Sequence, residues 1–341
     1  MKKRKFVLLL CLALLPGCGE EILKKPIADI FAEVAESEEP MGGVTPGISF
    51  ETTAPALTEI QTEPPSPEPA QDSDDPTSNS TPAPNSTPTP TPSPAQAYIH
   101  PPFITADSFD SSGFSNKKLG WYFMKNNEHQ PTRGAAEIDI SAYNGYYLGD
   151  TTEKYIWLTF DLGYENGYTA SILDTLKEKN ESAAFFCVGA YIRDNPELTQ
   201  RMAAEGHLVV NHSDKHPSFP DISDQRILDE IYETARRYKE LTGLDMPAFF
   251  RPPSGEYSER TLFIAKEAGY KTIFWSFAYR DWLVDDQPGK DYAINIVLDN
   301  LHNGEILLLH AVSSSNAEAL PDIIDAVKAQ GYEFKSLFDL P

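Results

Sequence analysis

The most specific chemical signal in this 341-residue chain is a pair of histidines four residues apart, His212 and His216. Imidazole nitrogens are common ligands of divalent metal ions, and side chains four residues apart lie on one face of a helical turn. A chance pair with this spacing is not rare, but this one follows an apolar segment, 207–211, that is typical of a strand. We therefore predict that the two rings share a divalent metal ion.

Three further polar side chains stand where predicted strands end. They are Asp161, Arg251 and His310, at the ends of the apolar runs 155–161, 248–251 and 305–310. In βα architectures active sites are built at the carboxyl ends of the strands, so we expect these side chains to meet His212 at one rim. Taken singly, each also has a structural interpretation as a helix cap, an ion-pair partner or a buried core group. The convergence of four segments favours a catalytic site.

The elements that must position these residues alternate regularly from Tyr155 onward. We expect strands at 155–161, 182–188, 207–211, 248–251, 271–276 and 305–310, and helices at 170–180, 196–205, 223–241, 258–268, 291–302 and 316–330. Repeated βα units predict an α/β protein with a parallel sheet or a barrel. The segment is short for eight full units, which favours a small or incomplete (β/α) barrel.

The N-terminus has the layout of a secretory signal peptide over residues 1–17. Four cationic residues precede an apolar run from Phe6 to Leu15, which is about half the roughly 20 residues that a transmembrane helix needs. A small residue directly before Cys18 resembles the lipobox of bacterial lipoproteins. We expect acylation of Cys18 and export to the outer face of the cytoplasmic membrane, facing the cell wall. An ordinary cleaved signal is the alternative.

Composition divides the rest of the chain. Residues 18–97 are acidic and contain much of the chain's proline, so they bury too little apolar surface to offset their ordering entropy. We predict a disordered Pro/Thr/Ser-rich tether there, an extension packed on the barrel at 98–149, and the barrel domain at 150–341. The net charge of −23 disfavours nucleic-acid partners. A single cysteine beyond the first segment, Cys187, excludes a disulfide framework in the folded part.

Together these segments resemble the NodB-homology polysaccharide deacetylases, carbohydrate esterase family 4. The five motifs of that family stand in order, as Thr159-Phe-Asp161, His212-Ser-x-x-His216, Arg251-Pro-Pro-Ser-Gly255, Asp281-Trp282 and Leu308-Leu-His310. The resemblance covers about 150–341, and its delta-lactam-biosynthetic de-N-acetylase subgroup extends it back to about Asn116. It implies a distorted (β/α)7 barrel that hydrolyses N-acetyl groups on a cell-wall aminosugar, and we expect a monomer.

The resemblance also implies a role for each motif residue. Asp161 would be the general base toward water that a divalent ion acidifies, and Arg251 would keep that carboxylate ionised. His310 would be the general acid that protonates the leaving amine, held protonated by Asp281. The backbone N–H of Ser254 would help to hold the oxyanion, and Trp282 would line the acetyl pocket.

One residue departs from the family pattern at the metal. His212 and His216 would hold a divalent ion, with zinc expected, but the usual third ligand is an aspartate directly after the catalytic one. This chain has Leu162 there, and leucine cannot ligate. Waters, or a carboxylate such as Glu165, would complete the site.

The subgroup narrows the expected substrate to N-acetylmuramic acid in peptide-free peptidoglycan, whose freed amine closes to muramic delta-lactam as in spore cortex. Alternatives are N-acetylglucosamine or chitin-like glycans, an acetyl ester on xylan, and a non-catalytic, lipid-anchored wall-binding module. Leu162 favours the last, whereas retention of the acid, the base and both histidines argues against it. Aromatic residues such as Trp121 and Tyr122 either stack on sugar rings or pack beneath the barrel.

Overall fold

A computed structural model describes residues 98–341 of the chain, apart from 126–127 and 135. The predicted signal peptide at 1–17, the acylated Cys18 and the tether at 18–97 lie outside the described residues and stay predictions. Within the described residues, no helix is long and apolar enough to cross a bilayer.

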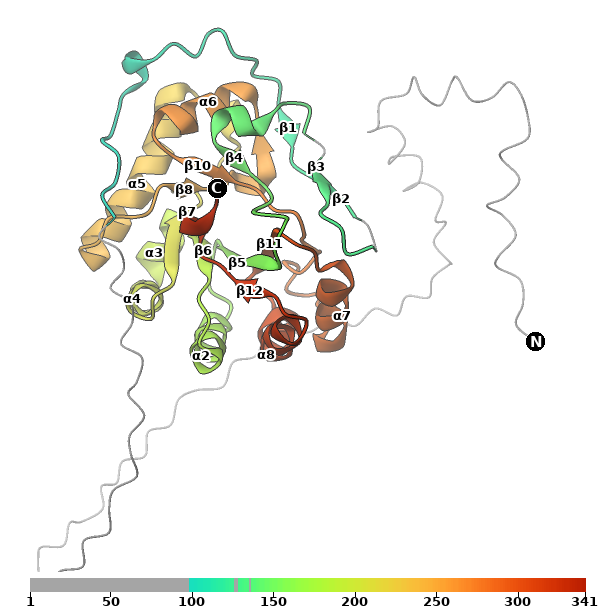
Figure 1. The fold of residues 1–341 in the computed structure, drawn as a ribbon. Coiled ribbons are helices and arrows are strands. Elements are labelled where there is room, and N and C mark those ends of the chain that lie inside the picture. Colours follow the sequence, from blue (N-terminus) through green and yellow to red (C-terminus); the bar gives the residue numbers. More distant parts are fainter. Residues whose placement is uncertain (1–97, 126–127, 135) are drawn as a thin grey trace, which may run out of the picture. The chain divides into compact units, whose positions relative to one another are not determined.

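The centre of the fold is a parallel sheet in the order β11-β5-β6-β7-β8-β10-β4, with β12 beside β5 (Figure 1). Its strands are β4 (Gly145–Tyr146), β5 (Tyr155–Leu162), β6 (Ala184–Cys187), β7 (Leu208–Asn211), β8 (Phe249–Phe250), β10 (Lys271–Ile273), β11 (Glu305–His310) and β12 (Glu333–Phe334). Every strand predicted from Tyr155 onward is present, shortened by one to three residues at some ends. Two strands of the sheet were not predicted, β12 and β4, of which β4 comes from the N-terminal extension.

The sheet curls so that the chain beyond β10 meets β11. The backbone N–H of Ser276 donates to Ile306 O over 3.0 Å, and Leu308 N–H donates to Phe277 O over 3.0 Å. Because β11 already pairs with β5 on its other side, these bonds join the two sides of the sheet. The expected distorted (β/α) barrel is thereby confirmed, and the distortion lies where β8 and β10 contribute only two or three paired residues.

Helices cover the outside of the sheet (Figure 1). They are α2 (Thr169–Lys179), α3 (Gly189–Asp194), α4 (Pro196–Ala204), α5 (Asp224–Thr242), α6 (Glu259–Glu267), α7 (Lys290–Asn300) and α8 (Ser314–Ala329). Their ends follow local chemistry, because Ser258 forms a capping box at the start of α6 and left-handed Gly243 ends α5. The short α3 was not predicted.

Side-chain alternation along β5 decides which residues face the site. Ile156, Leu158, Phe160 and Leu162 pack with residues of α2 and α8 in the core between sheet and helices. Trp157 instead packs with residues of β6, β7 and β11 in the barrel interior. Because successive side chains of a strand point to opposite faces, Thr159 and Asp161 also face the interior.

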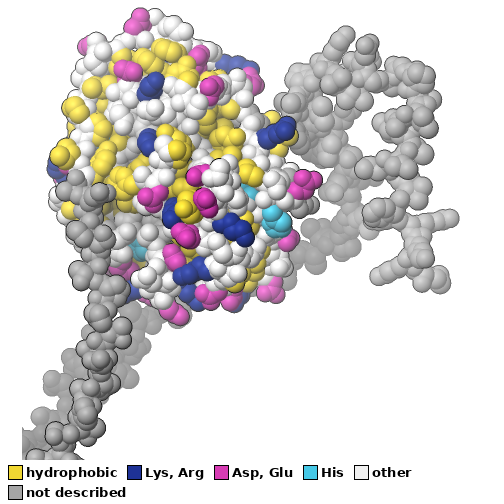
Figure 2. All heavy atoms as spheres, viewed as in Figure 1, with side chains coloured by type: hydrophobic (Ala, Val, Ile, Leu, Met, Phe, Trp, Pro, Cys, Tyr) yellow, Lys and Arg dark blue, Asp and Glu magenta, His cyan; other side chains and the backbone are white. Residues whose placement is uncertain are grey.

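The extension before the barrel packs on one side of it. Its strands β1 (Leu119–Gly120), β2 (Phe123–Met124) and β3 (Arg133–Gly134) form two small antiparallel pairs, β1 with β9 (Glu256–Tyr257) and β2 with β3. Trp121 stacks on Phe274 with ring centroids 4.5 Å apart, and its indole N–H donates to Trp275 O. Trp121 is thus part of the packing beneath the barrel, whereas Tyr122 is exposed. On the face drawn in Figure 2, acidic and basic side chains are interspersed.

Candidate active site

A cavity of about 870 Å³ opens among segments that follow the sheet strands. Six of the residues predicted from the sequence line it: Asp161, His212, His216, Ser254, Trp282 and His310. Arg251 and Asp281 are fully buried, each bonded to a lining residue. The remaining predicted residue, Cys18, lies outside the described residues.

Asp161 is bonded to a guanidinium inside the barrel. Arg251 Nη1 donates to Asp161 Oδ1 over 2.6 Å, and Nη2 donates to Thr159 Oγ1 over 3.0 Å. The guanidinium carbon lies 3.9 Å from the ring centroid of Phe186, a stacked arrangement. Burial raises the pKa of Asp161, but the positive charge of Arg251, aided by His212 and His310, outweighs it and holds that pKa below its usual value. Asp161 is therefore an ionised carboxylate at neutral pH.

His310 lies beside Asp161, and its surroundings shift its pKa in the opposite direction. The two residues are register partners of β5 and β11, so their side chains leave the sheet side by side. His310 Nδ1 is 2.7 Å from Asp281 Oδ1, and its backbone N–H donates to Asp281 Oδ2. Burial lowers the pKa of His310, but the charge of buried Asp281 outweighs this and raises it above the usual value. The carboxylate thus favours the protonated imidazole, whose Nε2 edge is directed away from Asp281.

Asp281 has support that the sequence did not reveal. Asn316, in the first turn of α8, donates its side-chain amide to Asp281 Oδ2 and accepts a hydrogen bond from the Tyr279 hydroxyl. These bonds fix the carboxylate that orients His310. Asn316 lies within a helix, where an amide carries no distinguishing local signal.

The prediction that both histidines lie on a helical turn is wrong. The segment that carries them is a bend and not a helical turn, because Ser213 and His216 adopt left-handed backbone conformations with φ of 66° and 58°. Local bonds stabilise this shape: Ser213 N–H donates to Asn211 Oδ1, and His216 N–H donates to Ser213 Oγ. The bend still brings the rings together, with centroids 4.9 Å apart at an interplanar angle of 74°.

The donor set of this bend fits a divalent metal. His212 Nδ1 is 2.8 Å from Arg251 O, a bond that fixes the proton on Nδ1 and leaves the lone pair on Nε2. Burial lowers the pKa of His212 to about 4, so the ring is neutral, as a metal ligand must be. Its Nε2 lies 3.6 Å from Asp161 Oδ2. His212 and His216 would hold the ion, which would supply Lewis-acid polarisation and acidify water.

The structure gives no support to Glu165, the carboxylate expected as a third protein ligand beside the two histidines. Leu162 is fully buried on the helix-facing side of β5, opposite to Asp161. Glu165 does not complete the site, because its carboxylate accepts hydrogen bonds from Gly167 N–H, Thr169 and the Tyr191 hydroxyl at the start of α2. No group of three or more ligating His, Cys, Asp or Glu side chains is found in the described part of the chain.

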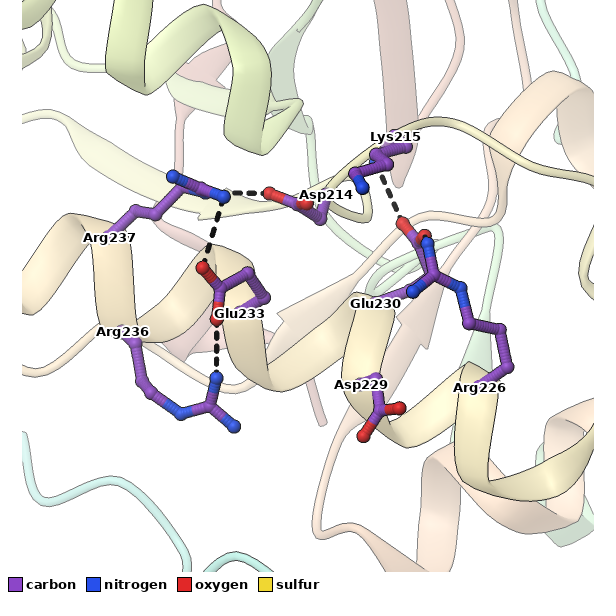
Figure 3. A pocket seen from close by; sticks show the side chains of 8 residues that line it. All are labelled: Asp214, Lys215, Arg226, Asp229, Glu230, Glu233, Arg236 and Arg237. Atoms are coloured by element: carbon purple, nitrogen blue, oxygen red, sulfur yellow. Dashed lines mark hydrogen bonds and ion pairs between the residues drawn. The ribbon is translucent and has the colours of Figure 1, made fainter.

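Helix α5 holds the histidine bend from outside the cavity (Figure 3). The carboxylate of Glu230, fully buried, accepts the backbone N–H of Lys215 over 2.7 Å and a second bond from Arg226. Arg237 donates to Asp214 over 2.7 Å. Lys215 and Asp214 lie between the two histidines, so this network fixes the backbone that carries both rings. Sequence reasoning missed it because these residues resemble an ordinary charged helix face.

The two substrate-side residues also lie at the cavity. Ser254 is exposed in a tight turn, Pro253–Gly255, with a left-handed φ of 56°. The Trp282 ring is 47% exposed and lies 5.5 Å from the His310 ring, between centroids. Both positions allow the predicted contacts with a substrate, and those roles stay predictions.

Comparison with known proteins agrees with this geometry. The family model for polysaccharide deacetylase matches residues 148–273. The peptidoglycan-N-acetylmuramic acid deacetylase PdaA of Bacillus subtilis is 43% identical over 227 residues, which cover 66% of this chain and 86% of PdaA. This chain belongs to the polysaccharide deacetylases. The solved structure of B. subtilis PdaA, a family 4 carbohydrate esterase, matches with a TM-score of 0.65 over 66% of this chain and 97% of that one.

Two more distant relatives of this polysaccharide deacetylase are described with a different substrate or as lacking activity. A peptidoglycan-N-acetylglucosamine deacetylase of Bacillus cereus is 34% identical over 193 residues, or 55% of this chain and 88% of the relative. A structure from Bacillus anthracis described as a pseudoenzyme of the family is 30% identical, with a TM-score of 0.54, over 57% of this chain and 68% of that one. Because the family includes a pseudoenzyme, membership alone does not indicate activity, and the site residues must also be considered.

The site residues of this deacetylase supply hydrolytic chemistry. As predicted from the sequence, ionised Asp161 would accept a proton from water as the water attacks an acetyl carbonyl carbon. The protonated form of His310 would donate a proton to the nitrogen that leaves. When the surroundings of two neighbouring ionisable groups shift their pKa values in opposite directions, those shifts indicate which group is the base and which is the acid.

We expect replacement of Asp281 to shift the pH profile. In Asp281→Asn the negative charge that raises the pKa of His310 is gone, so His310 loses its proton at a lower pH. The alkaline limb of kcat/KM should move down by about one to three pH units. Exposed Asp299→Asn on α7 is the control. An unchanged alkaline limb in Asp281→Asn would show that His310 is not the titrating acid.

We expect Glu230→Ala to loosen the histidine bend. The substitution removes the buried acceptor of the partly buried Lys215 N–H, which should lower the free energy of unfolding by about 1–3 kcal/mol. Amide hydrogen exchange at Lys215 should accelerate, and Glu230→Gln, which keeps one acceptor oxygen, should restore part of the protection. Asp229→Ala, exposed on the same helix, is the control. Equal exchange in both alanine variants would refute the role given to Glu230.

Proposed function

We propose that this enzyme removes the acetyl group of N-acetylmuramic acid in peptide-free peptidoglycan, in preparation for muramic delta-lactam. The observation that carries the reaction type is the pairing of ionised Asp161 with protonated His310 at one cavity. The similarity to PdaA, whose name states this substrate, and the subgroup-like segments support the choice of sugar.

The proposed reaction is an amide hydrolysis. Water adds to the acetyl carbonyl, the bond between carbonyl carbon and sugar nitrogen breaks, and acetate and a free amine leave. The amine then forms an amide with the lactyl carboxylate of the same sugar, with loss of one water. That closure requires a free carboxylate, so a peptide attached to the lactyl group would prevent it. The backbone N–H of Ser254 would assist the oxyanion, and Trp282 would contact the acetyl group.

We further propose that the enzyme requires a divalent ion, with zinc as the expected metal, held by His212 and His216. Neutral imidazoles are ligands that zinc commonly takes, and two of them leave positions for water. The full protein would act as a monomer on glycan strands, exported and anchored through acylated Cys18 on the outer face of the cytoplasmic membrane.

Two alternatives rest on specific observations. Deacetylation of N-acetylglucosamine is favoured by the similarity to the B. cereus enzyme. A non-catalytic wall-binding role is favoured by Leu162 and by the existence of a pseudoenzyme among the structural relatives. The retained Asp161, Arg251, Asp281 and His310, with their bonds intact, support catalysis over the second alternative.

Acetate release by the full-length chain tests the proposed function. We expect release from peptide-free muramoyl glycans, loss of activity on chelation and recovery when zinc returns. Asp161→Asn should lower turnover by about 10²- to 10⁴-fold while the folded state, checked by thermal melting, persists.

Three other results of the acetate-release measurement would contradict parts of the proposal. Release from N-acetylglucosamine glycans alone would overturn the muramoyl assignment and leave the deacetylase chemistry. Activity that survives chelation would overturn the metal requirement. No release from any glycan with any divalent metal would favour the wall-binding module.

Membrane fractionation tests the anchor. Cys18→Ser should move the exported protein from the membrane fraction to the soluble fraction, because the acylated side chain is gone. Cys11→Ser, within the predicted signal peptide, is the control and should leave the protein with membranes. Persistent membrane association of Cys18→Ser would identify another anchor.

A further inference from the structure

The active-site cavity is cationic in a protein that is strongly acidic. The chain carries a net charge of −23, yet the only carboxylate among the residues lining this cavity is Asp161, which is paired with Arg251. Besides His310, whose charge is balanced by buried Asp281, two basic side chains line the same cavity, Lys125 and Arg280. The excess positive charge indicates an anionic group on the ligand.

Lys125 comes from the extension that precedes the barrel, directly after β2. Its ammonium nitrogen lies 5.6 Å from the ring centroid of Phe277, which is fully buried. The ion pairs found among the described residues, which include those of the neighbouring Lys117 and Lys118 and of Arg280, do not involve Lys125. Its charge is thus available to a ligand in the cavity.

Arg280 directly precedes Asp281, the residue that orients His310. Its Nη2 lies 2.6 Å from Asp286 Oδ2, and both side chains are about two-thirds exposed, at 64% and 68%. An exposed ion pair of this kind contributes little to stability, so a ligand carboxylate can share or replace Asp286. A guanidinium can also bind a carboxylate through two parallel hydrogen bonds.

We infer that Lys125 and Arg280 bind the free lactyl carboxylate of the muramoyl sugar. This inference rests on the proposed function and identifies its specificity determinants. The lactyl ether and the acetamido group occupy adjacent carbons of the sugar ring, so an acetamide placed at His310 brings the carboxylate to the same cavity. Attachment of a peptide converts that carboxylate to a neutral amide. The two cations thereby select peptide-free glycan, and a neutral N-acetylglucosamine unit makes no such contact.

A pair of matched ligands tests the contact between the two cations and the lactyl carboxylate. N-acetylmuramic acid and its lactyl amide differ at one group, and their affinities for the full-length protein can be measured by NMR titration. We expect the wild type to bind the acid at least about tenfold more tightly than the amide. Lys125→Gln and Arg280→Gln should each reduce this acid-to-amide ratio several-fold, and Arg280→Lys should retain part of it. Raising the salt concentration should also reduce the ratio.

Two control variants carry cations in similar settings away from the cavity. Lys154 lies 5.5 Å from the ring centroid of Tyr332, and Arg193 forms an exposed pair with Asp194. Lys154→Gln and Arg193→Gln should leave the ratio at the wild-type value. Thermal melting of all variants excludes unfolding as the cause of a changed ratio.

The outcomes separate this inference from the proposed function. Equal affinities for acid and amide in the wild type, or an unchanged ratio in both cavity variants, would overturn the carboxylate contact even if acetate is released from muramoyl glycans. A ratio that depends on both cations, without acetate release from muramoyl glycans, would support the contact and overturn the proposed function.

Discussion

The structure depends on a guanidinium buried at the centre of the barrel. Arg251 is fully buried, and such a charge is tolerated only when it is paired and its N–H groups are bonded. Its donors reach Asp161 and Thr159 on β5 and the backbone oxygens of Ile273 and Phe274 at the end of β10. The same interaction therefore joins distant strands and keeps Asp161 ionised. Removal of either partner of such a pair leaves an uncompensated buried charge, which typically costs about 3–5 kcal/mol.

The proposed assignment of Asp161 as base and His310 as acid follows from the charged group bonded to each. The two residues are neighbours in one sheet; Asp161 is buried, and His310 is partly buried at the cavity. A cation behind the carboxylate lowers its pKa, and a carboxylate behind the imidazole raises its pKa. Each environment thus favours the charged form of the group, with the proton on the histidine. The proposed deacetylation mechanism uses this distribution of charge.

Segments outside the five motifs complete the site. Helix α5 holds the bend between the two histidines through Glu230 and Arg237, and α8 holds Asp281 through Asn316. The N-terminal extension contributes part of the cavity lining, including Lys125. In our proposals the barrel residues thus carry the reaction, whereas the surrounding elements hold the histidine bend in place and determine the choice of sugar.

The sequence by itself determined the order of strands and helices and the rim at which Asp161, His212 and His310 meet. It did so because hydrophobic periodicity and helix caps are local, and the carboxyl ends of parallel strands share one edge. Only the tertiary structure decided that the histidine segment is a bend, that Leu162 faces the helices and that Glu165 is bonded to Gly167 and Thr169 at the start of α2. These three features depend on the alternation of side chains along a strand and on hydrogen bonds that no local sequence pattern reveals. The placement of Lys125 and Arg280 in one cavity is of the same kind, since 155 positions of chain separate them.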